Sequence, residues 1–271
     1  MNVSAHLQNL GIPAIMISRV GKDELGAEIK AFMKAHHLDT RRVQTDPVHP
    51  TGMVKVTIAA NNDATYEIVH PVAWDFINAT PKLCELVGEA KAIVFGTLAC
   101  RDTITRTSLT RLLEHAPLAI YDVNLRPPHY SKSVIESFLH LADIVKMNDD
   151  ELKIINGWFG VATQSDEETL SYLKDKFALD ALIVTQGGDG AMLLDETGFY
   201  KAYGYKVKVA DTVGSGDAFL AGYLKNRFEG TPAQETLDYA CALGAVVAMH
   251  RGANPPIQEK DVFAIMHNYI R

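Results

Sequence analysis

From residue 91 onward, short runs of apolar residues alternate with longer stretches in which apolar residues recur at helical spacing. The short runs are typical of strands buried on both faces, and the longer stretches are typical of amphipathic helices. We predict strands at 92–95, 118–121, 143–147, 181–185 and 191–194. We predict helices at 103–114, 131–141, 150–158, 167–177, 215–228 and 232–250. This alternation predicts an α/β fold in which helices cover both faces of a parallel sheet.

Residues 51–76 follow a different pattern. The stretch "TGMVKVTIAA" alternates polar and apolar residues, "NND" is a turn signal, and "TYEIVHPVAWDF" follows as a second strand. This pattern predicts a β-hairpin with one face in water. The hairpin is either a small lid over an active site or an edge hairpin without a function of its own.

Composition and charge narrow the class of protein. Of the 271 residues, 47% are hydrophobic, which suits one large domain with a sizeable core. The formal net charge is −7 and no run of Lys and Arg occurs, so we expect neither nucleic acid nor a membrane as a partner. The 3 cysteines form no CxxC pair, and the apolar run at 12–17 is too short for a membrane span. We therefore expect a cytoplasmic protein.

The segment "DTVGSGDAF" (211–219) carries the strongest candidate chemistry. It lacks the GxxxxGK[ST] of a P-loop, the third glycine of a dinucleotide fingerprint and the GxSxG of a nucleophile elbow. The remaining interpretation is a loop that binds an anion. Gly214 and Gly216 would adopt backbone angles that glycine tolerates, so that successive N–H groups point to one side, and the positive N-terminal end of the following helix would attract the anion. Asp217 would lie in the first helical turn and accept a proton. Alternatively, it only complements the helix dipole.

The same segment resembles the second signature, D-T-x-G-x-G-D, of the ribokinase-like, or PfkB, family of sugar kinases. Further resemblances follow the family's order: "YDVNLRPPHY" (121–130), "KMNDDEL" (146–152), "VTQGGDGAMLL" (184–194) and "HRGANPP" (250–256). The first of these resembles bacterial fructokinases and 2-keto-3-deoxygluconate kinases, and "HPVAWDFI" (70–77) resembles the end of the fructokinase lid. The resemblance implies a ribokinase-like three-layer α/β/α sandwich with a central, mostly parallel sheet. One kinase domain would span 1–271, with the β lid inserted at 51–76.

The resemblance also implies roles for single residues. Asp217 would be the base that takes the proton from a sugar hydroxyl group. The N–H groups of Gly214, Ser215 and Gly216 would form an anion hole for the phosphoryl group. The residues implied to contact the nucleotide are Asn148, Thr185, Gly187, Gly190 and Gly216.

The implied cofactors are metal ions. Mg²⁺ would arrive with ATP, and Asn148 and Glu151 would organise it through water. Asn148 can equally be read as the cap of the helix that follows it. A monovalent cation, K⁺, would be bound by the side chain of Asp211 and by carbonyl groups near Val213 and Gly252. Prolines stand where the family often has a hydroxyl residue after this segment.

The resemblance also implies residues that contact the sugar. Asn124 and Arg126 lie just past a predicted strand, where open α/β sheets bind ligands. Arg126 would bridge sugar and phosphate or bind a substrate carboxylate; alternatively, it is a structural arginine paired with an acid. Trp74, Asp75 and His70 would close over the sugar; alternatively, these three residues have core or surface roles. Asn2 would point at the sugar.

The beginning of the chain, "MNVSAHLQNLG", resembles the stretch directly after the family's first signature, so we expect the family's first strands to be missing from it. We expect an ATP-dependent kinase that phosphorylates the terminal hydroxyl group of a small sugar, with fructose first and 2-keto-3-deoxygluconate as the alternative. A non-catalytic sensor of sugar or nucleotide on the same fold is the alternative from another class. Two copies would form a homodimer through the lid.

Overall fold

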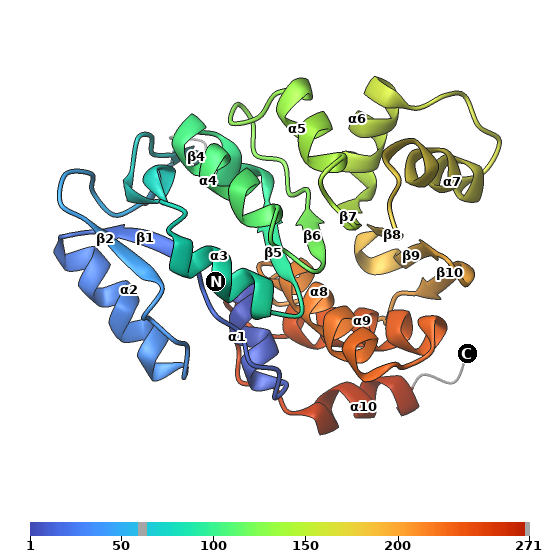
Figure 1. Cartoon of the computed structure of the whole chain (residues 1–271). Coiled ribbons are helices and arrows are strands. Elements are labelled where there is room, and N and C mark those ends of the chain that lie inside the picture. The colour runs from blue at the N-terminus through green and yellow to red at the C-terminus, as the bar shows by residue number, and fades with distance from the viewer. Residues whose placement is uncertain (59–63, 269–271) are drawn as a thin grey trace. The chain divides into compact units, whose positions relative to one another are not determined.

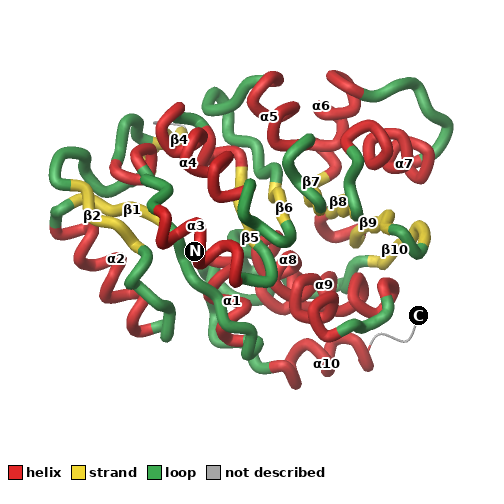
Figure 2. Tube along the Cα trace, in the orientation of Figure 1, coloured by secondary structure: helices red, strands yellow, loops and turns green. Residues whose placement is uncertain are grey.

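The computed structural model describes residues 1–58 and 64–268. The chain forms two compact units, one made of Met1–Ala14, Ala92–Thr97 and Leu118–Arg271 and the other of Ile15–Lys91 and Leu98–Pro117. Figure 1 labels their helices and strands, and Figure 2 colours them by type. Among residues 1–58 and 64–268, no helix combines the length and the hydrophobicity that a membrane span requires.

The first unit is built on a six-stranded sheet with the order β10-β9-β8-β7-β6-β5. Its strands are β5 (Ile93–Gly96), β6 (Ala119–Asp122), β7 (Ile144–Asn148), β8 (Ala181–Thr185), β9 (Gly190–Asp195) and β10 (Gly198–Tyr203). β5 to β8 pair in parallel, as the alternation predicts. β9 belongs to the sheet as expected but pairs antiparallel with both neighbours. The short connection from β8 to β9 cannot hold the crossover that a parallel pair needs.

Helices cover the two faces of this sheet in separate groups (Figure 1). One face carries α5 (Lys132–Leu139), α6 (Asp149–Phe159) and α7 (Asp166–Phe177); the other carries α1 (Asn2–Asn9), α8 (Ser215–Glu229) and α9 (Ala233–Ala248), on which α10 (Glu259–Asn268) packs. Successive side chains of a strand point to opposite faces. Ile120 accordingly packs in one cluster with Leu220 of α8, whereas the ring of Tyr121 lies near Phe138 of α5, with centroids 6.1 Å apart. The predicted three-layer α/β/α arrangement is confirmed.

The second unit contains the predicted hairpin. Its elements are β1 (Ser18–Gly21), α2 (Glu24–Ala35), β2 (Val43–Asp46), β3 (Val54–Ile58), β4 (Ala64–Ile68), η1 (Ala73–Phe76), α3 (Pro81–Glu89) and α4 (Thr103–Leu113), and η2 (Thr97–Cys100) begins in the first unit. β3 and β4 pair antiparallel, as predicted, and the expected turn "NND" lies outside the described residues. The second strand is shorter than predicted because Pro71 has no N–H group to continue a ladder.

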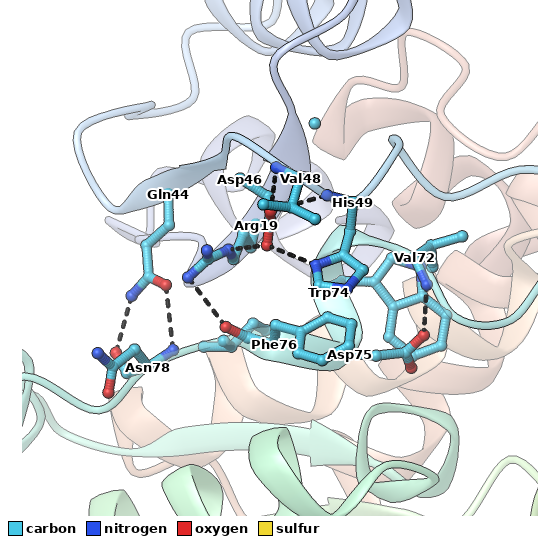
Figure 3. A network of polar contacts seen from close by, with 12 residues as sticks. Arg19, Gln44, Asp46, Val48, His49, Val72, Trp74, Asp75, Phe76 and Asn78 are labelled. Carbon is cyan, nitrogen blue, oxygen red and sulfur yellow. Dashed lines mark hydrogen bonds and ion pairs between the residues drawn. The ribbon is translucent and has the colours of Figure 1, made fainter.

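Asp46, at the end of β2, is the centre of a polar network in this unit (Figure 3). Its buried carboxylate accepts hydrogen bonds from the N–H groups of Val48 and His49, both at 2.8 Å, and pairs with Arg19 at 2.7 Å. Arg19 also donates to the carbonyl oxygen of Phe76 at 3.0 Å, so the network joins β1, β2 and η1. Burial by itself would raise the pKa of Asp46, but the donors of His49 and Val48 and the charge of Arg19 lower it to about 2.

Replacing Asp46 with asparagine tests this network. A carboxylate with a depressed pKa stabilises the folded state above its ordinary value of 3.8, and that contribution is lost as the pH falls toward 2. We expect Asp46→Asn to lower the free energy of unfolding near neutral pH, and the deficit to shrink as the pH falls through this window. Urea unfolding at several pH values measures the deficit. The control is Glu85→Gln, an exposed carboxyl of the same unit, and a deficit that stays constant on acidification would contradict the assignment.

Candidate active site

The start of α8 brings together residues from distant parts of the chain. α8 begins at Ser215 and carries Asp217 in its first turn, as the sequence predicts. Asn2 donates a hydrogen bond from Nδ2 to Oδ2 of Asp217 at 2.8 Å, and the Nδ2 group of Asn254 donates to Oδ1 of Asn2 at 2.9 Å. Oδ1 of Asp217 receives no donor from the described residues, so it is available to a ligand.

The two glycines of the predicted anion-binding loop serve different purposes. At Gly214 the φ angle is +86°, and a Cβ atom would lie 2.5 Å from the carbonyl oxygen of Ala253, so only glycine fits. Gly216 has no positive φ, which corrects the expectation that both glycines provide unusual backbone angles. A Cβ atom on Gly216 would lie 3.3 Å from Nζ of Lys146. Gly216 therefore leaves room for a buried ammonium group beside the first turn of α8.

The predicted anion hole is partly engaged within the chain. The N–H group of Ser215 donates to the carbonyl oxygen of Thr212 at 3.2 Å. In the described part of the chain, the N–H groups of Gly214, Gly216 and Asp217 have no acceptor. First-turn N–H groups lack partners within their own helix and attract anions. A phosphoryl group would find its free donors at these positions and not at Ser215.

Residues 252–254 hold the loop before α8 in place. The N–H groups of Val213 and Gly252 donate to the two carboxylate oxygens of Asp211 at 3.0 and 3.1 Å, so the residues of the predicted cation site lie together. These donors, from Val213 first and then Gly252, lower the pKa of Asp211. The carbonyl oxygen of Ala253 accepts from Nε2 of the buried His6 at 2.9 Å, which anchors α1 to the same segment.

Asn148 caps α6, which confirms the structural alternative for this residue. Its side chain accepts from the N–H group of Glu151 at 2.8 Å, and Glu151 accepts from the N–H group of Asn148 at 2.9 Å. The other carboxylate oxygen of the buried Glu151 accepts from the N–H group of Leu125 at 2.7 Å. Glu151 therefore also fixes the loop that follows β6. A role toward a metal ion or nucleotide is compatible with this cap.

Thr185, Gly187 and Gly190 lie at the carboxyl end of β8. Thr185 is directly opposite Asn148 in the register of β7 and β8. Gly187, with φ of +56°, begins the short helix η3 (Gly187–Asp189). Gly190 has φ of +117°, and a Cβ atom there would collide with the carbonyl oxygen of Ala202. The residues predicted to contact the nucleotide thus share one end of the sheet with Asn148.

Asn124 and Arg126 lie in the loop after β6, and both are exposed. Asn124 has φ of +42°, in the left-handed region. Arg126 donates from Nη1 to the carbonyl oxygen of Leu125 at 2.8 Å and has no carboxylate partner among the described residues. The alternative of an arginine paired with an acid is not observed, so its guanidinium group is available to a ligand.

Sequence reasoning missed Asp122 and Lys146. They are register partners on β6 and β7, and Nζ of Lys146 lies 3.0 and 3.1 Å from the two oxygens of Asp122. Burial raises the pKa of Asp122, and the ammonium group acts in the opposite direction. The sequence feature that could have indicated this pair is the lysine inside the apolar run "DIVKMN", because charged side chains are rarely buried unless they are paired.

Trp74 lies in η1 of the second unit and is half-buried. The guanidinium carbon of Arg101 lies 3.9 Å from the ring centroid of Trp74. A Cβ atom on Gly52 would collide with Nε1 of Trp74. The neighbouring Asp75 is fully buried and pairs through both oxygens with Arg101 at 2.7 Å (Figure 3 shows Asp75 beside Trp74). Asp75 is therefore structural, and contact between Trp74 and a sugar stays a prediction.

The carboxylate oxygens of Glu151 and Asp211 are suitable ligands for the cations that the resemblance implies. Among residues 1–58 and 64–268, no group of 3 or more His, Cys, Asp and Glu side chains could hold a metal ion directly. Each oxygen of Glu151 accepts one backbone N–H group and keeps a second lone pair, which suits water-mediated contact with Mg²⁺. Each oxygen of Asp211 is used in the same way, which leaves lone pairs for a monovalent cation.

Residues 1–260 match the family described as "pfkB family carbohydrate kinase". Probable fructokinase-7 of Arabidopsis thaliana is 26% identical over an alignment of 277 positions, which covers 96% of this chain and 80% of that protein. The fructokinase of Escherichia coli is 26% identical over an alignment of 266 positions, which covers 93% of this chain and 85% of that protein.

Solved structures show the same fold. The fructokinase of Vibrio cholerae O395 with fructose, ADP and potassium ion bound has a TM-score of 0.80 at 23% identity, over 97% of this chain and 88% of that one. The fructokinase of Xylella fastidiosa with bound ATP has a TM-score of 0.83 at 18% identity, over 98% of this chain and 89% of that one. The chain therefore has the ribokinase-like α/β fold that the resemblance implies.

Gly214→Ala tests the loop before α8. The added methyl group would meet the carbonyl oxygen of Ala253 and force alanine into a positive φ, at a cost of about 1–3 kcal/mol. A loop displaced by about 1 Å would lower kcat for ADP release with sugar and Mg-ATP by about 10²-fold. Denaturant unfolding and initial rates measure both effects. Gly157→Ala on α6 is the control, because nothing lies within 4 Å of its Cβ position; an unchanged kcat in Gly214→Ala would contradict the role of this loop.

Proposed function

Because the chain belongs to the pfkB family of carbohydrate kinases, we propose that it transfers the γ-phosphoryl group of ATP to the terminal hydroxyl group of fructose. The observation that carries this proposal is the start of α8, where Asp217 and the free N–H groups of Gly216 and the N-cap residue Gly214 lie together. The family makes the chain a sugar phosphotransferase, so the non-catalytic sensor is set aside.

Asp217 acts as the base in the proposed reaction. Asn2 holds its Oδ2, and Oδ1 accepts the proton of the sugar hydroxyl group. The hydroxyl oxygen bonds to the γ-phosphorus while the bond from phosphorus to the bridging oxygen breaks, which releases ADP. In a loose transition state the proton leaves late, so a carboxylate is a sufficient base. The N–H groups of Gly214 and Gly216 stabilise the charge on the moving group, and the positive end of α8 adds to this.

The nucleotide and its cations complete the proposal. We expect ATP to lie at the carboxyl ends of β7 and β8, in contact with Asn148, Thr185, Gly187 and Gly190 and with its terminal phosphate at Gly216. Mg²⁺ bound with ATP would supply positive charge to the phosphates, and Glu151 would contact the ion through water. K⁺ near Asp211, Val213 and Gly252 is the further cation that we expect.

Arg126 bears on which sugar is used. The similarity to fructokinases supports fructose, with Asn2, Asn124 and Trp74 as the other expected contacts. 2-Keto-3-deoxygluconate is the second candidate, because Arg126 lacks a carboxylate partner in the described residues and its planar fork suits a substrate carboxylate.

We expect the enzyme to act in the cytoplasm, where Mg-ATP is supplied, and to form a homodimer through the hairpin within 51–76. The apolar side chains of Met53 and Val54, at the start of this hairpin, are 41% and 54% exposed. A second copy would remove them from water.

The choice of substrate is tested by ADP release with Mg-ATP in potassium buffer. Fructose, 2-keto-3-deoxygluconate, ribose and adenosine are compared at equal concentration. We expect the highest kcat/KM with fructose. Turnover with none of the four compounds would contradict the proposal, and preference for 2-keto-3-deoxygluconate would replace fructose by the second candidate.

Asp217→Asn should lower kcat by about 10²–10⁴-fold, because the positioned base is lost. Affinity for ATP, measured by calorimetry, should stay nearly unchanged. The matched control is Asp261→Asn, the same substitution at a first-turn acid of α10. If Asp217 only complemented its helix, the two variants would behave alike and kcat would stay within a few-fold of the parent.

Arg126→Gln should raise the KM for the sugar and leave the KM for ATP unchanged. A charged hydrogen bond is worth about 1.5–3 kcal/mol, so we expect kcat/KM to fall about 10–100-fold. The loss should be larger with 2-keto-3-deoxygluconate than with fructose if the guanidinium group meets a carboxylate. The exposed Arg111 provides the control Arg111→Gln, and equal kinetics in both variants would show that Arg126 does not contact the substrate.

A further inference from the structure

Lys146 places an ammonium group inside the sheet of the first unit. Its neighbours in β7, Val145 and Met147, are fully buried, and only 9% of the Lys146 side chain is exposed. Removing an ammonium ion from water is costly unless its surroundings replace the lost hydration. The surroundings of Lys146 must therefore supply interactions that replace this hydration.

Asp122 provides part of the interactions that replace the lost hydration of Lys146. β6 and β7 run in parallel, and their register sets Asp122 beside Lys146, just as it sets Ile120 beside Ile144. Because side chains alternate along a strand, Asp122 and Lys146 face the same side as these two isoleucines, which is the side packed on α8. Both oxygens of Asp122 lie within hydrogen-bond distance of Nζ. No other described residue accepts a hydrogen bond from Nζ, although an ammonium group has three donors.

The ammonium group of Lys146 lies beside the N-terminus of α8, where a positive charge is unfavourable. Gly216 is in the first turn of α8, and a Cβ atom on it would lie 3.3 Å from Nζ of Lys146. Cations are favourable near the C-terminus of a helix and unfavourable near its N-terminus, where free N–H groups carry partial positive charge. An ammonium group and a helix N-terminus side by side repel each other, and the carboxylate of Asp122, which pairs with Nζ, offsets part of this repulsion. A phosphoryl anion would be attracted to both groups.

We propose that Lys146 is a catalytic residue that donates a hydrogen bond to the phosphoryl group during transfer. This inference rests on the proposed function. The phosphorus–oxygen bond to ADP breaks as the bond to the sugar oxygen forms, and the hydroxyl proton goes to Asp217; Lys146 stays protonated throughout. Asp122 holds the ammonium group and balances its charge before the nucleotide arrives. A Cβ atom on Gly216 would crowd Nζ of Lys146, at 3.3 Å, beside the place that we assign to the phosphoryl group.

The competing explanation is a purely structural ion pair. Lys146→Met by itself cannot separate the two, because it leaves the carboxylate of Asp122 buried without its partner and destabilises the fold. The double variant Asp122→Leu with Lys146→Met removes the charge and the unpaired partner together. Replacing a buried ion pair by hydrophobic residues of similar size is often neutral for stability. This variant therefore tests chemistry in a folded protein.

We expect the double variant to unfold thermally near the temperature of the parent but to lose about 10²–10³-fold in kcat, as when one preorganised donor is removed. Calorimetric titration provides a readout besides activity. A non-hydrolysable β,γ-imido analogue of ATP should bind about tenfold or more weakly, and ADP should bind almost equally well. Lys153→Met, which removes a lysine on α6 that is 71% exposed, should change none of these quantities.

A folded double variant with kcat within a few-fold of the parent would overturn the role of Lys146. So would equal losses of affinity for ADP and for the analogue. If the parent chain phosphorylated no sugar, the proposed function would be wrong, but the titration would still report whether Lys146 contacts the terminal phosphate. If the parent were active and the double variant equally so, only this inference would fail.

Discussion

The first turn of α8 packs against the carboxyl ends of β6 and β7, and the electrostatics of that contact constrain the rest of the site. The helix presents unpaired N–H groups there, and the sheet presents an ammonium group held by a carboxylate. The carboxylate of Asp122 offsets part of the repulsion between the ammonium group and the helix N-terminus, and a phosphoryl anion would be attracted to both. The site is therefore arranged before any substrate binds, because the donors are fixed by a helix and a sheet that cannot move apart without exposing the core between them.

Segments from both ends of the chain hold this arrangement. Asn2 and Asn254 reach Asp217 through successive amide hydrogen bonds, and Gly252 and Ala253 contact the loop in front of α8. Glu151 likewise connects the start of α6 to the loop after β6, which carries Arg126. The candidate base, the phosphate donors and the sugar loop are thus each tied to regular structure. This agrees with a kinase in which catalysis rests on positioning and charge.

Much of the fold could be predicted from local pattern. The predicted strands from β5 to β9 and the helices from α4 to α9 are all present, with small differences at their ends. β10 was not predicted, because it is an edge strand in which only Ala202 is buried, and its sequence shows little apolar periodicity. The second strand of the hairpin was predicted too long because the apolar residues around Val72 suggest a strand, whereas they pack as a turn and η1. The role of Lys146 was not predicted, because a single charged residue does not interrupt the apolar pattern of a strand.

The sequence by itself determined the order of the elements, the start of α8 and the place of Asp217 in its first turn. These depend on local spacing and on glycine, which act within a few residues. Only the tertiary structure decided that Gly216 makes room for Lys146, that Asn2 holds Asp217 and that Ser215 uses its N–H group within the loop. The reason is physical: hydrogen bonds and ion pairs between residues far apart in the chain depend on distances that only the packed strands and helices set.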